Sequence, residues 1–202
     1  INFVEKNYPS VIPHLSSCKS PQGMMSTLVK THFAQKIGVD PSQIVMTSVM
    51  PCVAKKDEIA RPALMTEHDI HGKKTKLWDT DYVLTARELA KLIRLQKVPF
   101  NSLKESQYDD PFGKSTGAAV IFGATGGVLE AALRTVYEVV TNKPIPSPAL
   151  FAPVRGFGGI REASVTVAGT TVNVAVVHGI ANVQHLLKDA MSGKSKYHLI
   201  EV

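Results

Sequence analysis

Cysteine is scarce in this sequence of 202 residues. The two cysteines, Cys18 and Cys52, lie 34 positions apart, and no Cys-x-x-Cys pair occurs. This is too little cysteine for a disulfide-stapled scaffold, and two isolated cysteines are more typical of a reducing compartment. The sequence therefore predicts a cytoplasmic protein, with the periplasm or a eukaryotic organelle left open.

Long apolar runs and aromatic side chains are also in short supply. No apolar run approaches the ~18–20 residues that span a bilayer, and the first residues lack the pattern of a signal peptide. Aromatic residues make up 6% of the sequence and the basic residues are scattered, which argues against a stacking surface for nucleic-acid bases. The 23 basic residues outnumber the 17 acidic ones, and the net charge of +6 suits an acidic partner.

The remaining composition is that of an ordinary globular domain, 44% hydrophobic and 20% charged. Caps and apolar spacing predict helices at 1–8, 21–37, 85–95, 128–140 and 181–191. Apolar or alternating runs predict strands at 44–50, 82–84, 118–122, 162–167, 171–177 and 197–202. The first of these strands is continuous and β-branched, as in a buried parallel strand. Residues 60–80 are polar and aperiodic, which predicts an excursion over the surface, and the alternation of strands and helices predicts an α/β fold.

The two ends predict that the sequence is an interior piece of a longer protein. It opens at Ile1 within an amphipathic pattern and without an initiator methionine. It stops at Val202 within an apolar, strand-like run. Domain boundaries usually fall in polar, flexible linkers, and neither end has that character.

Cys52 is the strongest candidate for a residue with a chemical role. It follows the strand at 44–50, and Pro51, which lacks an N–H donor, stops that strand and fixes the loop. Lys55 and Lys56 follow within one turn, where their ammonium groups stabilise the thiolate, the form that attacks electrophiles or binds metals. No histidine lies nearby in the sequence to activate a nucleophile. The residues themselves leave a functional cysteine and a structural one equally open.

Two glycine-rich turns form a second group of candidates. Residues 122–128 (Phe-Gly-Ala-Thr-Gly-Gly-Val) precede a predicted helix, and residues 155–160 (Arg-Gly-Phe-Gly-Gly-Ile) carry another cluster. Such turns either offer N–H groups to an anion or let a helix pack closely against its neighbours. The first turn matches neither the Walker A pattern nor the dinucleotide fingerprint, and the seven histidines show no metal-ligand spacing. Without a family resemblance, the residues therefore predict no more than an α/β domain with a Cys–Lys loop and two glycine turns.

Residues 50–58 (Met-Pro-Cys-Val-Ala-Lys-Lys-Asp-Glu) resemble the middle signature of the iron-only, or FeFe, hydrogenases, Met-Pro-Cys-x-x-Lys-x-x-Glu. Residues 16–22, 122–134, 154–160 and 197–202 are similar to further segments of the same family, in the same order. The family's first signature, Thr-Ser-Cys-Cys-Pro-Gly-Trp, and its third, Met-Ala-Cys-x-x-Gly-Cys, do not occur in the sequence. We therefore expect a fragment of the hydrogenase catalytic domain that spans the interval between those two signatures.

The resemblance implies reversible reduction of protons to H2 at the H-cluster, a 4Fe-4S cubane bridged to a di-iron unit with CO, cyanide and dithiolate ligands. It implies two lobes of mainly parallel β-sheet flanked by helices, about 1–112 and 113–202, with the active site in the cleft between them. Ferredoxin or a similar acidic electron carrier is the implied redox partner. Neither nucleic-acid binding nor a membrane span is expected.

By the same resemblance, Cys52 is the only one of the four cubane ligands that the chain contains. Lys55 matches the lysine that donates a hydrogen bond to a cyanide ligand, and Ser16 matches the serine of the proton pathway, so both are expected to take part in catalysis. Residues that match the surroundings of the cofactor are Met50, Pro51, Pro21, Gln22 and Phe122. The fragment alone is expected to be inactive, because one cysteine of four cannot hold the cubane.

A second function, from a different class, stays open. Cytosolic iron–sulfur assembly proteins resemble hydrogenases and keep a segment like Met-Pro-Cys-x-x-Lys, but they do not evolve hydrogen. The turn at 124–127 and the Arg155-Gly156 pair are more similar to hydrogenases and favour the first function. A third interpretation, an α/β module that binds an anion through its glycine turns, leaves the Cys52 loop without a purpose.

Overall fold

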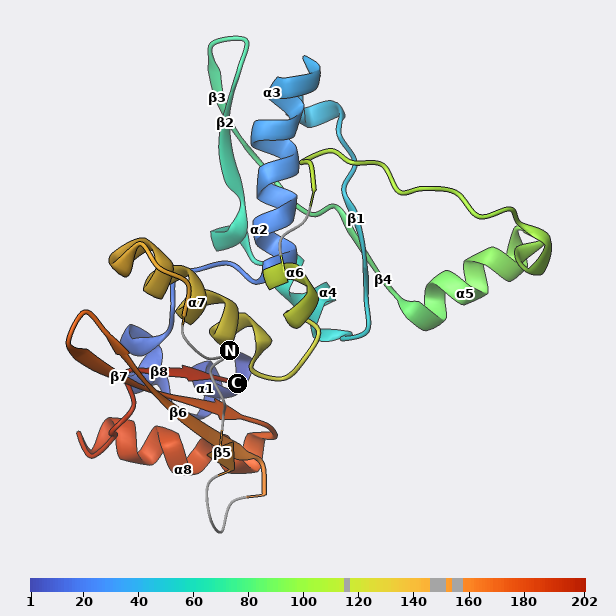
Figure 1. Cartoon of the computed structure of the whole chain (residues 1–202). Coiled ribbons are helices and arrows are strands. Elements are labelled where there is room, and N and C mark those ends of the chain that lie inside the picture. Colours follow the sequence, from blue (N-terminus) through green and yellow to red (C-terminus); the bar gives the residue numbers. More distant parts are fainter. Residues whose placement is uncertain (115–116, 146–151, 154–157) are drawn as a thin grey trace. The chain divides into compact units, whose positions relative to one another are not determined.

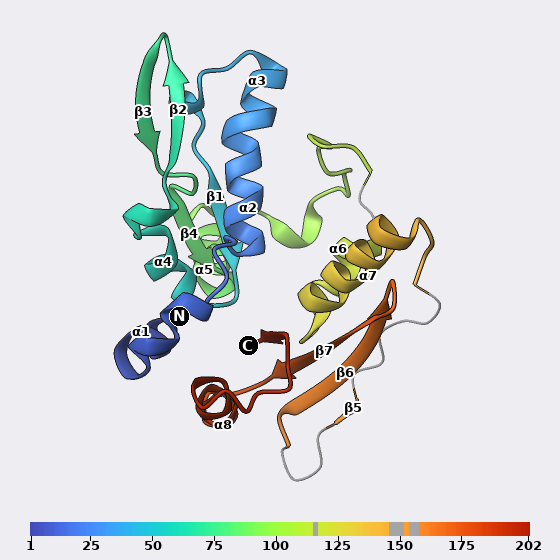
Figure 2. The same cartoon turned by 90° about the vertical axis from the view of Figure 1, so that its left-hand side faces the viewer.

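The computed structural model describes residues 1–114, 117–145, 152–153 and 158–202. The chain divides into two compact units. Unit 1 combines residues 1–15 with residues 114–202, and unit 2 comprises residues 16–113 (Figure 1, Figure 2). Both units contain helices and a parallel strand pair, which confirms the predicted α/β class. The lobe boundary near residue 112 and the cleft between the lobes remain predictions.

Unit 2 begins with one continuous helix over residues 21–37. It consists of α2 (Pro21–Leu28), the π-helical η2 (Val29–Phe33) and α3 (Ala34–Ile37). The hydroxyl of Ser20 caps its start by accepting a hydrogen bond from the Gly23 N–H, and Gly38 ends it with a φ of 66°. Both predicted ends are confirmed, whereas apolar spacing does not predict the π-helical turn between them.

The strands of unit 2 form two separate pairs. β1 (Thr47–Met50) and β4 (Tyr82–Thr85) are parallel, and β2 (Thr66–Ile70) and β3 (Lys73–Leu77) form an antiparallel hairpin. The strand expected at 44–50 is confirmed for its last four residues, but only Ser48 among them is buried, so the expectation of a fully buried strand is wrong.

The hairpin corrects the prediction of a surface excursion at 60–80. β3 has the sequence Lys-Lys-Thr-Lys-Leu and none of its residues is buried. In β2 only His68 is buried, so the hairpin does not need the alternation of apolar and polar residues by which strands are recognised, and the pattern is missing.

Two helices of unit 2 begin soon after its parallel strands: α4 (Ala54–Ile59) follows β1, and α5 (Ala86–Leu95) follows β4. The predicted capping box of α5 is confirmed, with the Glu88 N–H donating to Thr85 Oγ1 and the Thr85 N–H donating to Glu88 Oε2. Because β1 and β4 are parallel, the segments that leave them lie at the same edge of the pair. Three short 3₁₀ turns complete the unit: η3 (Pro41–Gln43), η4 (Pro62–Leu64) and η5 (Phe100–Ser102).

Unit 1 is built around a sheet with the strand order β5-β6-β7-β8. The predicted hairpin across Ala168 and Gly169 is confirmed, and β8 joins β7 in parallel. The strands are β5 (Ala152–Pro153), β6 (Ile160–Val167), β7 (Thr170–Val177) and β8 (Leu199–Glu201). The helices are α1 (Asn2–Asn7), η1 (Pro9–His14), α6 (Gly117–Ile121), α7 (Gly127–Thr141) and α8 (Ile180–Met191).

Two hydrophobic clusters cover opposite faces of β7. Ala175 and Val177 pack against α8, whereas Val174 and Val176 pack against α7. Successive side chains of a strand point to opposite faces of its sheet, so the run at 174–177 is buried on both sides. Unit 1 therefore has three layers, with the sheet between α7 and α8 (Figure 2).

The prediction of a strand at 118–122 is wrong, because residues 118–121 lie in the helix α6 and Phe122 follows its end. A five-residue apolar run has no periodicity that separates a strand from a helix, and its alanines favour a helix. Val120 is 81% exposed, which a buried strand would not allow. Residues 155–157 of the second glycine cluster lie outside the described residues. In the described part of the chain, no helix is both long and apolar enough to cross a membrane.

Candidate functional site

The Cys52 loop connects β1 to α4 at the carboxyl end of the parallel strand pair, as predicted. Pro51 and Cys52 are exposed, and the Cys52 thiol is free. The Cys52 carbonyl accepts a hydrogen bond from the Lys55 N–H at 3.2 Å, which connects the loop to the first turn of α4. An exposed thiol on such a loop is available as a ligand for a soft metal or an iron–sulfur cluster.

Lys55 and Lys56 are adjacent in the sequence but have different partners. Lys55 Nζ lies 2.6 Å from Glu58 Oε2 on the same helix, and the side chain is 24% exposed. Lys56 Nζ lies 2.6 Å from Glu88 Oε1 on α5, and the side chain is 40% exposed. An ammonium group has three N–H donors, so Lys55 can serve a further acceptor while it remains paired with Glu58.

Glu58 joins α4 to the start of α2. One carboxylate oxygen accepts from Lys55, and the other accepts from the hydroxyl of Ser20, the residue that caps α2. The two family-like segments at 16–22 and 50–58 are therefore in direct contact. This contact is a property of unit 2 alone, since both segments belong to it.

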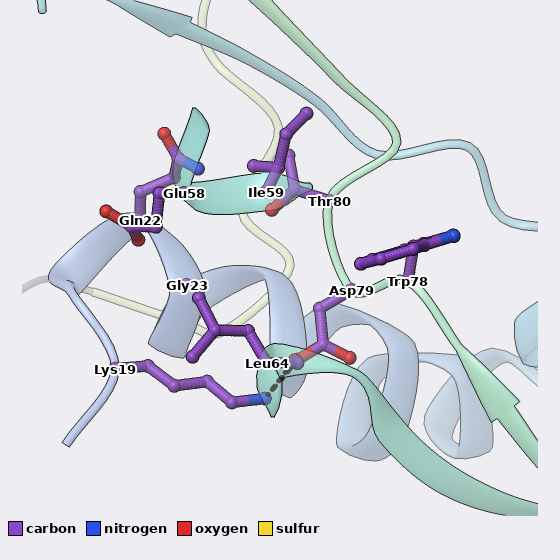
Figure 3. A pocket seen from close by; sticks show the side chains of 9 residues that line it. All are labelled: Lys19, Gln22, Gly23, Glu58, Ile59, Leu64, Trp78, Asp79 and Thr80. Carbon is purple, nitrogen blue, oxygen red and sulfur yellow. Dashed lines mark hydrogen bonds and ion pairs between the residues drawn. The ribbon is translucent and has the colours of Figure 1, made fainter. Parts of the chain in front are cut away.

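Gln22 is 7% exposed, and neither polar atom of its amide has a hydrogen-bond partner. It lines a small cavity of about 20 Å³ together with Glu58, Lys19 and Asp79. Figure 3 shows Gln22 and Glu58 close together beside the start of α2. A water molecule needs roughly 10–15 Å³ of such space. Because a buried amide without partners is costly, Gln22 is the residue whose chemistry best fits a group bound beside α2.

Asp79 is a buried charge that the sequence did not single out. Its carboxylate pairs with the ammonium group of Lys19 (Figure 3) and accepts hydrogen bonds from Thr27 at 2.6 Å and Thr66 at 2.9 Å. Lys19 also donates to the Leu64 carbonyl at 2.9 Å. No periodicity marks Asp79, because its partners come from the segment before α2, from α2 and from β2. The network fixes the residues on either side of the cavity.

The remaining predicted site residues have simpler surroundings. Ser16 is exposed, and its hydroxyl oxygen accepts a hydrogen bond from the Cys18 N–H at 3.1 Å. Pro21 is an exposed residue in the first turn of α2, and Met50 is the half-buried last residue of β1. Phe122 is 42% exposed at the corner between α6 and α7. It belongs to unit 1, whereas every other predicted site residue belongs to unit 2.

At the start of α7, two backbone N–H groups are already paired with a carboxylate of the chain itself. The Gly126 N–H donates to Glu201 Oε1 at 2.9 Å, and the Leu129 N–H donates to Glu201 Oε2 at 2.7 Å. An internal carboxylate therefore takes the place that the anion-binding interpretation gave to an external ligand. The close-packing interpretation fits better, because a Cβ on Gly127 would lie 1.7 Å from the Ile121 carbonyl oxygen.

Within the described residues, no three His, Cys, Asp or Glu side chains gather as a metal site. Cys52 is thus a single soft ligand rather than part of a complete set. The donor chemistry fits one corner of a cubane, with a cation and an unpaired amide on neighbouring segments. The sequence holds one other cysteine, Cys18, and the two thiols are not joined in a disulfide.

Comparison with protein families identifies the class of this chain. The family described as "Iron only hydrogenase large subunit, C-terminal domain" matches residues 1–202. The chain therefore belongs to the iron-only hydrogenase family. It is 47% identical to the periplasmic Fe hydrogenase large subunit of Nitratidesulfovibrio vulgaris, over 98% of this chain and 45% of that protein. It is 41% identical to iron hydrogenase 1 of Clostridium pasteurianum, over 100% of this chain and 34% of that protein.

The assembly proteins considered as an alternative are also relatives. The protein NAR1 of Arabidopsis thaliana is 30% identical over 100% of this chain and 44% of its own length. Among solved structures, an apo single-residue variant of the FeFe-hydrogenase HydA1 from Chlamydomonas reinhardtii matches with a TM-score of 0.76 and 34% identity, over 98% of this chain and 55% of that one. The chain spans about a third to a half of the curated relatives it matches.

Proposed function

We propose that this chain is part of the catalytic domain of an iron-only hydrogenase that reversibly reduces protons to H2 with electrons from ferredoxin. The observation that carries the proposal is the free, exposed Cys52 thiol within a family-like loop that contacts the start of α2 through Glu58. Family membership over residues 1–202 supports it. By itself the chain is expected to be inactive, because it supplies one cysteine ligand of the four.

In this proposal Cys52 and Gln22 face the H-cluster from unit 2. When bound, the H-cluster supplies the electron storage and the site at which protons are reduced. The Cys52 thiolate holds one iron of the cubane, because soft sulfur ligands suit iron–sulfur clusters. The Gln22 amide has a free donor and a free acceptor, so it can orient a polar ligand beside α2.

Lys55 offsets negative charge and donates a hydrogen bond to the cofactor, while Glu58 holds its ammonium group in place. Side chains that support ligands in this way orient them and tune the metal. Ser16 accepts from the Cys18 N–H and keeps its own O–H to donate, which suits a step in proton transfer. Apolar side chains that limit water around the cofactor are Pro21, Met50, Pro51 and Phe122.

The assembly-factor alternative is less well supported. The chain is 41–47% identical to three hydrogenases but 28–30% identical to the assembly proteins. Production of H2 by the full-length protein separates the two functions, because the assembly proteins do not evolve hydrogen.

Substitution of Cys52 by serine in the full-length protein tests the ligand assignment. We expect Cys52→Ser to lose the cubane, since a hydroxyl is a much poorer iron ligand than a thiolate. Iron and sulfide content, the visible absorption of the cluster and H2 evolution are the measurements. Cys18→Ser is the matched control, because Cys18 is also exposed and free. A Cys52→Ser protein with full iron content and activity would overturn the assignment.

Substitution of Lys55 by methionine tests the supporting cation. We expect a loss of about 10–100-fold in activity or cofactor retention, whereas Lys56→Met, on the adjacent residue paired with Glu88, leaves both near the wild-type level. The infrared bands of CO and cyanide report the di-iron unit directly. Equal effects of the two substitutions would show that Lys55 has no special place in the site.

The electron carrier can be probed through ionic strength. The net charge of +6 favours an acidic partner such as ferredoxin, and the attraction is screened over about 10 Å at 0.1 M salt. We expect the rate of electron transfer from ferredoxin to the full-length enzyme to fall as salt rises. A salt-independent rate would contradict charge steering.

A further inference from the structure

The carboxylate of Glu201 connects two parts of unit 1 that are 72–75 residues apart in the sequence. It lies in β8, and both of its oxygens accept backbone N–H groups at the start of α7, from Gly126 and Leu129. The first N–H groups of a helix have no partner within the helix. α7 has no side-chain cap of its own at Gly126, so Glu201 is its cap.

The start of α7 also packs closely against the sheet. Val176 of β7 is the register partner of Glu201 in β8. A Cβ on Gly126 would lie 2.9 Å from Val176 Cγ2, and the φ of Gly126 is +87°. Only glycine fits a position with so little room and this backbone conformation. The start of α7 is therefore held from the sheet by packing on Val176 and by the Glu201 carboxylate.

The backbone of Phe122 lies close to the first residue of α7. A Cβ on Gly127, the first residue of α7, would come 3.2 Å from Phe122 Cα and 1.7 Å from the Ile121 carbonyl oxygen. The Gly127 N–H also donates to the Ala124 carbonyl at 2.8 Å, which closes the turn. A shift of the first turn of α7 would therefore move the backbone of Phe122, because no space separates them.

We propose that Glu201 is a positioning residue that fixes Phe122 through the first turn of α7. This role rests on the proposed function, in which Phe122 is one of the apolar residues around the di-iron unit. A carboxylate suits the task because it offers two acceptors to two N–H donors and places negative charge at the positive end of a fifteen-residue helix. Glutamine has one acceptor and would direct an NH₂ group at one of the two donors.

The first test is hydrogen exchange in the full-length protein, read on peptides that cover residues 123–130. We expect Glu201→Gln to raise exchange at the Gly126 and Leu129 amides at least tenfold, since hydrogen bonds to charged groups are the stronger ones. Glu201→Asp keeps the carboxylate, so we expect its exchange rates to lie between those of the wild-type protein and those of Glu201→Gln. Glu138→Gln, an exposed glutamate on the same helix, is the control. Unchanged exchange in Glu201→Gln would overturn the cap.

The second test reads the di-iron unit through its CO and cyanide infrared bands. We expect shifted or broadened bands in Glu201→Gln and a partial return in Glu201→Asp. Leu186→Ala is the structural control, because it removes a core side chain from the face of the sheet opposite α7 and is expected to leave the bands unchanged. Faster exchange with unchanged bands would overturn the positioning role. A wild-type protein without these bands would overturn the proposed function and this role with it, while the exchange result would still decide the cap.

Discussion

Units 1 and 2 have interiors of different kinds. Nearly all buried hydrophobic residues of the described chain lie in unit 1, most of them in the two clusters on either side of β7. In unit 2 only Ala34 and Val83 belong to this class. Every buried polar or charged residue of the described chain lies in unit 2: Gln22, Ser26, Lys30, Ser48, His68, Asp79 and Thr80.

The two units are therefore stabilised differently, unit 1 by apolar packing and unit 2 largely by buried polar and charged groups. Apolar packing is non-directional and tolerates changes that keep volume. Buried charges lose their hydration, and only well-placed partners offset the free energy that this costs. Lys30, which is 3% exposed, lies 2.8 Å from Asp81 and donates to the Trp78 carbonyl, and Thr80 donates to Ser26 at 2.6 Å. The interior of unit 2, which carries Cys52 and Gln22, is therefore held by directional hydrogen bonds and ion pairs. These restrict where the loops of the unit can lie.

The largest expected effect comes from removing a buried charge of unit 2. We expect Lys30→Met to lower the free energy of unfolding by about 2–3 kcal/mol, because the Trp78 carbonyl loses its donor and Asp81, which keeps the Met46 N–H, loses its ammonium partner. Urea unfolding followed by the fluorescence of Trp78, the one tryptophan of the sequence, is the measurement. Lys56→Met, at the exposed Lys56–Glu88 pair, should cost far less, because water replaces the lost partner there. Equal losses would erase the distinction between the two kinds of site.

An intermediate effect is expected in unit 1. Leu133, which is 3% exposed in the cluster between α7 and β7, can be replaced by methionine at nearly constant volume. We expect Leu133→Met to cost less than about 1.5 kcal/mol, measured by circular dichroism in urea. If this loss exceeded that of Lys30→Met, the apolar interior would be the less tolerant one and the comparison would be reversed.

The smallest effects are expected at the surface, and they should be alike in both units. Hydrogen bonds from Lys56 and the Thr85 N–H lower the pKa of Glu88 to about 2, and hydrogen bonds from Lys196 and Tyr197 lower the pKa of Glu162. A depressed carboxyl pKa contributes stability above the ordinary value of 4.5. That contribution is lost as pH falls, for Glu88 between 4.5 and about 2.

Substitution of either glutamate by glutamine should flatten this part of the pH dependence of unfolding. Thermal unfolding at a series of pH values measures it, with Glu105→Gln, on an exposed loop residue, as the control. Because both glutamates lie near the surface, high salt should reduce both effects. A marked difference between Glu88→Gln and Glu162→Gln would show that the two units differ in their surfaces as well as in their interiors.

Features that depend on neighbouring residues could be predicted from the sequence. Ser20 and Gly38 set the ends of a helix, Thr85 and Glu88 form a capping box, and the turn at 168–169 closes a hairpin. Each of these signals acts within a few residues. The placement of Cys52 at the end of β1 follows from the same kind of evidence, since a proline after an apolar run stops a strand.

Features that depend on distant partners could not be predicted in this way. Lys19 meets Asp79 across 60 residues, and Glu201 reaches Gly126 across 75. The burial of Gln22 depends on the residues around its cavity from outside α2, and without the family resemblance it would have been placed on an exposed helix face. The strand predicted at 118–122 was wrong for another reason, because a run of five apolar residues has no periodicity that separates a strand from a helix.

The order of the segments has a consequence for synthesis of the protein. Unit 1 is interrupted by unit 2, so residues 1–15 leave the ribosome before the rest of their own unit has been made. At about 5–20 residues per second, the delay until residue 202 emerges is on the order of ten seconds or more. During that time Val4 and Val11, which are 7% and 4% exposed in the folded chain, lack the part of unit 1 that residues 114–202 form. Chaperones that bind short apolar segments have that interval in which to act on the nascent chain.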